Sequence, residues 1–168
     1  MVIILFPDIF KLMGKIHDKA AFDESCRLKA IEILVLIFEM DITLLKDLSK
    51  VKILIKQIFK YALEIEQEIT NEWLFPKTES YSEEEVIEEE KVRNSMSFLD
   101  RIVIVSESDI ILPIISESII TLLINKGGWK YKYLALLAIA QISKNIDNLN
   151  HVEPILDVNN NTYNTYNI

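Results

Sequence analysis

Residues that could do acid–base chemistry are concentrated in a run of glutamates between positions 83 and 90. The run consists of Glu83, Glu84, Glu85, Glu88, Glu89 and Glu90. Catalysis by paired carboxylates needs a dry pocket that separates their pKa values, and a run surrounded by water offers no such pocket. Two interpretations stay open: the run is a solvated linker, or it is a surface whose field attracts a basic partner.

The motifs of other catalytic or metal sites are missing from the sequence. His17 and His151 are far apart, and Cys26 is the only cysteine, so no cluster has the spacing of zinc ligands. No G-x-S-x-G elbow occurs. The pair Gly127-Gly128 lacks the neighbours that a phosphate-binding loop requires. We therefore expect a protein that is not an enzyme and that uses no metal or cofactor.

The composition favours helices. Half of the residues are hydrophobic, yet only 3 are glycine and 4 are proline, too few turn residues for many short strands. The net charge of −8 disfavours nucleic acid and anionic lipid headgroups. This charge either attracts basic proteins or merely keeps an apolar protein in solution. No uninterrupted apolar stretch reaches the roughly 18 residues of a membrane span. The predicted fold class is all-α.

Apolar residues that recur at spacings of three and four predict where the helices lie. Helices are expected over 2–16, 24–40, 49–70, 91–105, 108–125 and 129–144, and another is expected to begin at 151–157. The third has an apolar stripe of Val51, Leu54, Ile55, Ile58, Ala62, Ile65 and Ile69. Ser49 is its expected N-cap. An acidic loop is expected at about 73–90, because the glutamates leave little to bury.

A repeat of helix pairs is the main organising feature. Equivalent positions of three first helices carry Ala30-Ile31, Phe98-Leu99 and Ala138-Ile139. The last two lie about 40 residues apart, at the low edge of the HEAT or armadillo period. Residues 1–157 are therefore predicted to form a HEAT-repeat right-handed α-α superhelix, an armadillo-like solenoid. The polar segment 158–168 is expected to be a disordered or non-native tail.

Polar residues on the second helices mark a candidate binding face. The ridge on the helix expected over 49–70 consists of Lys52, Lys56, Lys60, Glu64 and Glu68. A later helix carries a similar ridge of Glu117, Thr121 and Asn125. In a solenoid such ridges line the concave face, where ligands bind. The alternative is that any half-exposed helix has a polar face of this kind.

Three stretches carry a resemblance to a known family. A tryptophan, an acidic stretch and the core Leu99-Asp100-Arg101 follow one another in NEWLFPKTESYSEEEVIEEEKVRNSMSFLDRI. A Leu-Pro helix start and a Trp-led, Ala-rich helix follow in IILPIISESIITLL and GGWKYKYLALLAIAQIS. The stretch CRLKAIEILVLIFEM is similar to the first helix that precedes these segments in the same family. Over roughly residues 6–156 the chain resembles the importin-beta (karyopherin-beta) family of nuclear transport receptors, with the karyopherin beta-3 branch most similar.

The resemblance implies a fragment of a nuclear import receptor, which carries cargo through nuclear pores between cytoplasm and nucleus under control of the Ran GTPase. The implied partners of the full-length receptor are protein cargo with basic signals, Ran and Phe-Gly nucleoporins. The glutamate run becomes a candidate acidic contact loop. The candidate concave cargo face consists of Glu64, Glu68, Glu117, Thr121 and Asn125.

The expected extent is about three repeats, which is short for such a receptor. Uncapped ends of a short solenoid expose apolar surface, so the fragment is expected to be prone to self-association. The alternative function is a HEAT-repeat scaffold or adaptor of another class, such as a phosphatase or trafficking scaffold. Such a scaffold would share the periodicity but would bind neither Ran nor Phe-Gly repeats.

Overall fold

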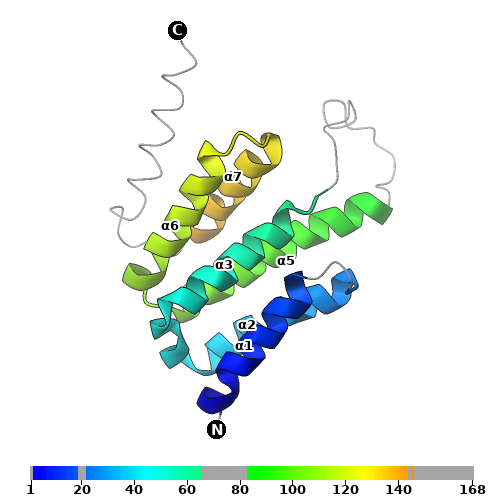
Figure 1. The fold of residues 1–168 in the computed structure, drawn as a ribbon. Helices are drawn as coiled ribbons and strands as arrows, with labels where there is room; N and C mark the ends of the chain where they lie inside the picture. The colour runs from blue at the N-terminus through cyan, green and yellow to red at the C-terminus, as the bar shows by residue number, and fades with distance from the viewer. Residues whose placement is uncertain (1, 19–21, 66–82, 144, 146–168) are drawn as a thin grey trace.

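The computed structural model describes residues 2–18, 22–65, 83–143 and 145, and all of their regular structure is helical (Figure 1). The elements are α1 (Val2–Asp18), α2 (Glu24–Met40), the 3₁₀ helix η1 (Ile42–Lys46), α3 (Leu48–Leu63), α5 (Glu83–Val105), α6 (Ser108–Ile124) and α7 (Trp129–Ser143). The all-α prediction is confirmed. The helix expected at 151–157 and the tail 158–168 lie outside the described residues.

Aspartate side chains cap the N-termini of two of the α-helices. The Asp23 carboxylate accepts the backbone N–H of Cys26 at 2.7 Å and thereby caps α2. Asp47 caps α3 by accepting the backbone N–H of Lys50. The prediction that Ser49 is this N-cap is therefore wrong: its hydroxyl instead donates to the Asp47 carboxylate at 2.6 Å. A carboxylate is the better acceptor there because it also carries the charge that a helix N-terminus favours.

The helix α5 begins earlier than the sequence pattern predicts. Residues 83–90, expected to belong to an acidic loop, form its first turns. Glutamate is a strong helix former, and negative charge near a helix N-terminus is favoured by the helix dipole. A stretch with six glutamates among its eight residues therefore still forms a helix. The remainder of the expected loop, 73–82, lies outside the described residues.

The helices pack as sequential pairs, α1 with α2, α3 with α5, and α6 with α7, and the pairs follow one another along the molecule (Figure 1). The helix α5 also packs against α2 and α7, so these three form one row, which we call the A layer. The helix α3 contacts α6, and a Cβ on Gly14 of α1 would lie 3.2 Å from Gln57 of α3. We call α1, α3 and α6 the B layer.

The core lies between the two layers. The stripe predicted on α3 is buried from Val51 to Ile65, and Ile69 lies outside the described residues. It meets the buried face of the A layer, which includes Leu34 and Phe38 of α2 and Leu99 of α5, all fully buried. The helix α2 has neighbours on several sides, yet part of its wide apolar arc, including Ile33 and Leu36, is exposed. No described helix combines the length and hydropathy needed to cross a membrane.

Polar contacts join successive pairs within the A layer. Arg101 of α5 donates from Nε and Nη2 to the two carboxylate oxygens of Glu39 on α2, at 2.7 and 2.6 Å. The neighbouring Asp100 accepts a hydrogen bond from Asn145, just after α7, at 3.2 Å. Leu99, which directly precedes Asp100, is fully buried. The Leu-Asp-Arg core therefore connects α5 to both neighbouring pairs.

Candidate protein-binding groove

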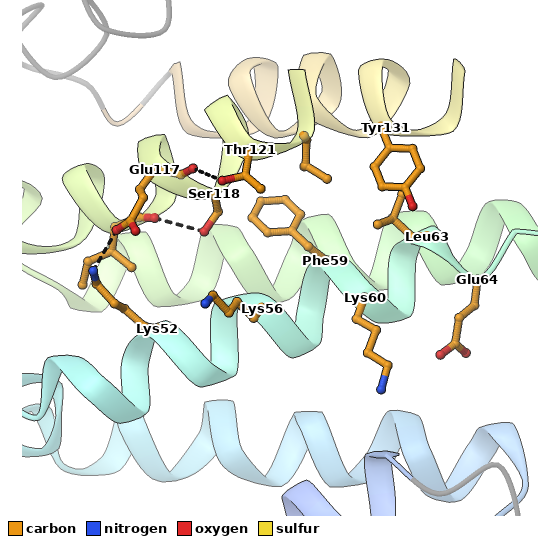
Figure 2. A pocket seen from close by; sticks show the side chains of 12 residues that line it. Lys52, Lys56, Phe59, Lys60, Leu63, Glu64, Glu117, Ser118, Thr121 and Tyr131 are labelled. Atoms are coloured by element: carbon orange, nitrogen blue, oxygen red, sulfur yellow. Dashed lines mark hydrogen bonds and ion pairs between the residues drawn. The ribbon is translucent and has the colours of Figure 1, made fainter. Parts of the chain in front are cut away.

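An open groove of about 480 Å³ runs over the B layer between α3 and α6, with α7 at one end (Figure 2). Its lining residues are Lys52, Lys56, Phe59, Lys60, Leu63, Glu64, Ile114, Glu117, Ser118, Thr121, Leu122 and Tyr131. The groove thus brings together the polar ridges that the sequence places on two separate helices. It combines an apolar floor with charged edges.

The floor of the groove is formed by side chains that also belong to the core. Phe59, Ile114 and Leu122 are almost fully buried, so only their outer edges face the groove. Leu63 and Tyr131 are half-buried, and Figure 2 shows them facing one another between α3 and α7. Apolar surface that stays partly in contact with water at this point is available to a partner.

The edge formed by α3 is basic. Lys52, Lys56 and Lys60 are all exposed, and a spacing of four residues places them on one side of the helix. Lys52 Nζ donates to Glu117 Oε2 on α6 at 2.7 Å, which closes the groove at one end. The hydrogen bond from Lys52, more than its charge or that of Lys56, lowers the pKa of Glu117 below its ordinary value. This pair is well exposed, so it contributes little to stability.

The structure places three of the five predicted cargo-face residues in the groove. Glu64, Glu117 and Thr121 line it, and Thr121 donates its hydroxyl to the Glu117 carbonyl at 2.8 Å. Asn125 is the C-cap of α6 and accepts the backbone N–H of Gly127 at 2.7 Å instead of lining the groove. Glu68 lies outside the described residues. Parts of both ridges thus line one groove, and the role of these residues as a cargo face stays a prediction.

Glu64 also has a structural contact. It is the C-cap of α3, and its carboxylate accepts a hydrogen bond from Arg27 of α2, which raises the pKa of the Arg27 guanidinium. The Arg27 guanidinium carbon lies 6.0 Å from the ring centroid of Tyr61. Figure 2 shows Glu64 at the far end of the groove, pointing away from α6. Its charge therefore joins α3 to α2, and Glu117 is the carboxylate nearer to the groove's middle.

The glutamate run lies in the first turns of α5, and Lys91, which directly follows it, donates to the backbone carbonyl of Glu64 at 3.4 Å. Glu90 is exposed and lies 4.0 Å from Arg93, one helical turn later. The side chains of Glu83, Glu84, Glu85, Glu88 and Glu89 lie outside the described part of the structure. Their role as an acidic contact surface stays a prediction.

The chemistry of the groove is that of a binding surface. It contains two carboxylates, Glu64 and Glu117, and they lie on different helices with cationic partners of their own. Among the described residues, no group of three or more His, Cys, Asp or Glu could hold a metal ion. What the lining offers is apolar contact area, three ammonium groups and the hydroxyls of Ser118 and Thr121.

Residue spacing placed the lysines on a candidate binding face but did not single out their positive charge. The spacing of Lys52, Lys56 and Lys60 marks a wet face, whereas the groove arises only because α6 lies opposite. Phe59 and Tyr131 were missed entirely, since each reads as an ordinary helix residue.

Comparison with known protein families finds no match for this chain, and comparison with curated proteins finds none either.

Proposed function

We propose that the chain is a protein-binding segment of a nuclear import receptor and that the groove between α3 and α6 contacts the transported protein. The observation that carries the proposal is the meeting of Glu64, Glu117 and Thr121 in one groove of the B layer. In the resemblance described above, the second helices provide the cargo face. The sequential pairing of six helices agrees with that arrangement.

The groove has the composition of a protein interface rather than of a small-molecule pocket. An interface core is apolar and its rim is polar and exposed, as in the floor and edges here. A stable interface buries about 800 Å² on each partner, which is more than the exposed surface of the groove lining. The groove is therefore one contact among several, and the other contacts would come from neighbouring repeats of a longer receptor.

Under this proposal the helix pairs belong to a right-handed HEAT-repeat superhelix whose inner face is the B layer. The acidic start of α5 supplies a second contact, suited to basic signals on the cargo. The receptor would then shuttle between cytoplasm and nucleus, with Ran controlling cargo release.

A pull-down with the full-length receptor tests the proposal. Immobilised receptor is expected to retain GTP-loaded Ran and Phe-Gly repeat peptides, with GDP-loaded Ran and Ser-Gly peptides as controls. Retention of neither Ran nor Phe-Gly peptides would contradict the proposal and favour a scaffold of another class.

A second arm tests the acidic contact. Replacing all six glutamates of the run by Gln is expected to weaken binding of basic cargo and to reduce its salt dependence. Unchanged affinity and an unchanged salt slope would show that the run makes no contact with cargo. Circular dichroism of the variant checks that α5 still forms.

A further inference from the structure

We propose that the occupant of the groove is an acidic amphipathic helix of a partner protein, whose carboxylates pair with the lysines of α3. The inference rests on the proposed function, because it names the chemistry of the segment that a protein partner places in this same groove. Although the whole chain is acidic, with a net charge of −8, the groove lining contains three lysines and two glutamates. The positive charge of the groove therefore favours an acidic partner, whereas the negative charge of the whole chain favours a basic one.

The apolar part of the argument concerns the floor. Phe59 and Leu63 of α3 present aromatic and aliphatic edges to the groove, and Tyr131 closes one end (Figure 2). Leu122 of α6 also lines the floor. A helix laid into such a groove buries side chains at positions i, i+3, i+4 and i+7. A partner segment with leucines at these positions would cover the floor and exclude water from it.

The charged part of the argument concerns spacing. Lys56 and Lys60 are four residues apart, so their Cα atoms lie about 6 Å apart along the axis of α3. Glutamates at i and i+4 of a partner helix have the same separation, so their carboxylates lie in register with the two lysines. Lys56 makes no hydrogen bond or ion pair within the part of the chain that the structure describes, whereas Lys52 is held by Glu117. Lys56 is therefore the ammonium group best placed to bind a carboxylate.

The opposite edge of the groove suits this orientation of the partner. On α6 the lining residues Ser118 and Thr121 are uncharged, and both hydroxyls already donate to carbonyls of their own helix. The partner's charged side is thus drawn toward α3, and its apolar side toward Phe59 and Leu122. Nucleic acid would pair with the lysines but would leave the apolar floor uncovered.

The experiment uses the whole 168-residue chain and a fluorescent synthetic helix with leucines at i, i+3, i+4 and i+7 and glutamates at i+1 and i+5. Fluorescence anisotropy measures binding, and the control probes are the same peptide with lysines for glutamates and a single-stranded oligonucleotide. The variants are Lys56→Glu and Thr121→Glu, which place negative charge on the two edges of the groove. The matched control is Lys29→Glu, an exposed lysine on α2 in the A layer.

We expect the acidic peptide to bind and each groove variant to weaken it by at least about threefold, since both variants introduce a like charge and Lys56→Glu also removes an exposed ion pair. Lys29→Glu should leave the affinity unchanged, and added salt should weaken binding. All three substituted positions are exposed, and thermal melts check that the variants fold. Amide shifts on peptide addition should centre on Phe59 and Thr121.

Several results would overturn the inference. They are absence of binding, equal binding of the lysine peptide, tighter binding of the oligonucleotide, or equal weakening by Lys29→Glu. The outcome is separable from that of the proposed function. If the acidic peptide binds but neither Ran nor Phe-Gly peptides are retained, the receptor function is contradicted and the acidic partner of the groove is supported. If Ran and Phe-Gly peptides are retained but the acidic peptide does not bind, the receptor function is supported and the acidic partner is contradicted.

Discussion

The ion pair between Arg101 of α5 and Glu39 of α2 provides a quantitative test of how neighbouring helix pairs are joined. The guanidinium and the carboxylate meet through two hydrogen bonds of 2.7 and 2.6 Å. The side chains are 27% and 25% exposed, so water screens the pair only in part. The Arg101 guanidinium carbon also lies 5.9 Å from the ring centroid of Phe98, which restricts its motion.

The expected magnitude lies between two limits. A hydrogen bond to a charged group contributes about 1.5–3 kcal/mol when buried, whereas an exposed ion pair contributes about 0–1 kcal/mol. The contact is bidentate but partly exposed, so we expect a coupling free energy of about 1–2 kcal/mol. The variants are Glu39→Gln, Arg101→Met and the two together. Urea unfolding at neutral pH gives the free energy of unfolding of each and hence the coupling.

The same pair predicts a pH dependence. The hydrogen bonds from Arg101, followed by its charge, lower the pKa of Glu39 from its ordinary value of 4.5. The contribution to stability is therefore fully present above pH 4.5 and is lost as the pH falls through the lower pKa of the folded state. A coupling below about 0.5 kcal/mol at neutral pH, or one that persists in acid, would refute this account of the contact.

Four further outcomes are expected from urea unfolding of single or paired variants. Leu99→Ala should lower the free energy of unfolding by about 2–5 kcal/mol, because Leu99 is fully buried in the central helix α5. Ser95→Ala should be neutral or stabilising, because Ser95 Oγ is buried with no hydrogen-bond partner among the described residues. Gly128→Ala should destabilise by about 1 kcal/mol, because Gly128 has φ of +105°, between α6 and α7. A double-mutant cycle on Lys52 and Glu117 should show no measurable coupling, because this pair is well exposed.

Much of the helical framework could be predicted from residue spacing. The bounds expected for the second helix, 24–40, agree with α2, and those expected for the last described helix differ from α7 by one residue. Apolar periodicity records which side of a helix is buried, and the buried stripe of α3 followed from it. The 3₁₀ helix η1 was missed because a single short turn leaves no periodic pattern.

The helix α5 shows where apolar periodicity fails as a guide. The sequence argument placed a loop over 83–90 because six of these eight residues are glutamate. Helix propensity and the helix dipole nevertheless favour a helix there, and the following turns are anchored by Val92 and Met96. Acidic residues are common in the first turn of a helix, and this preference would have placed the start of α5 closer to Glu83.

The candidate groove could be predicted only in part. Spacing identified Glu64, Glu117 and Thr121 as outward-facing residues of second helices, which the structure brings into one lining. Spacing could not show that Lys52 meets Glu117, because the two are 65 residues apart in the sequence. The basic edge of the groove, opposite in sign to the whole chain, follows from the packing of α3 beside α6.

Hydrogen exchange of the proposed receptor, alone and with its proposed cargo bound, tests most directly whether partners bind at the B-layer groove. We expect cargo to slow exchange of the amides in α3 and α6 that flank Phe59 and Thr121, while amides on the outer face of α2 remain unchanged. Slowed exchange confined to the A layer, or no change at either layer with cargo bound, would contradict the account.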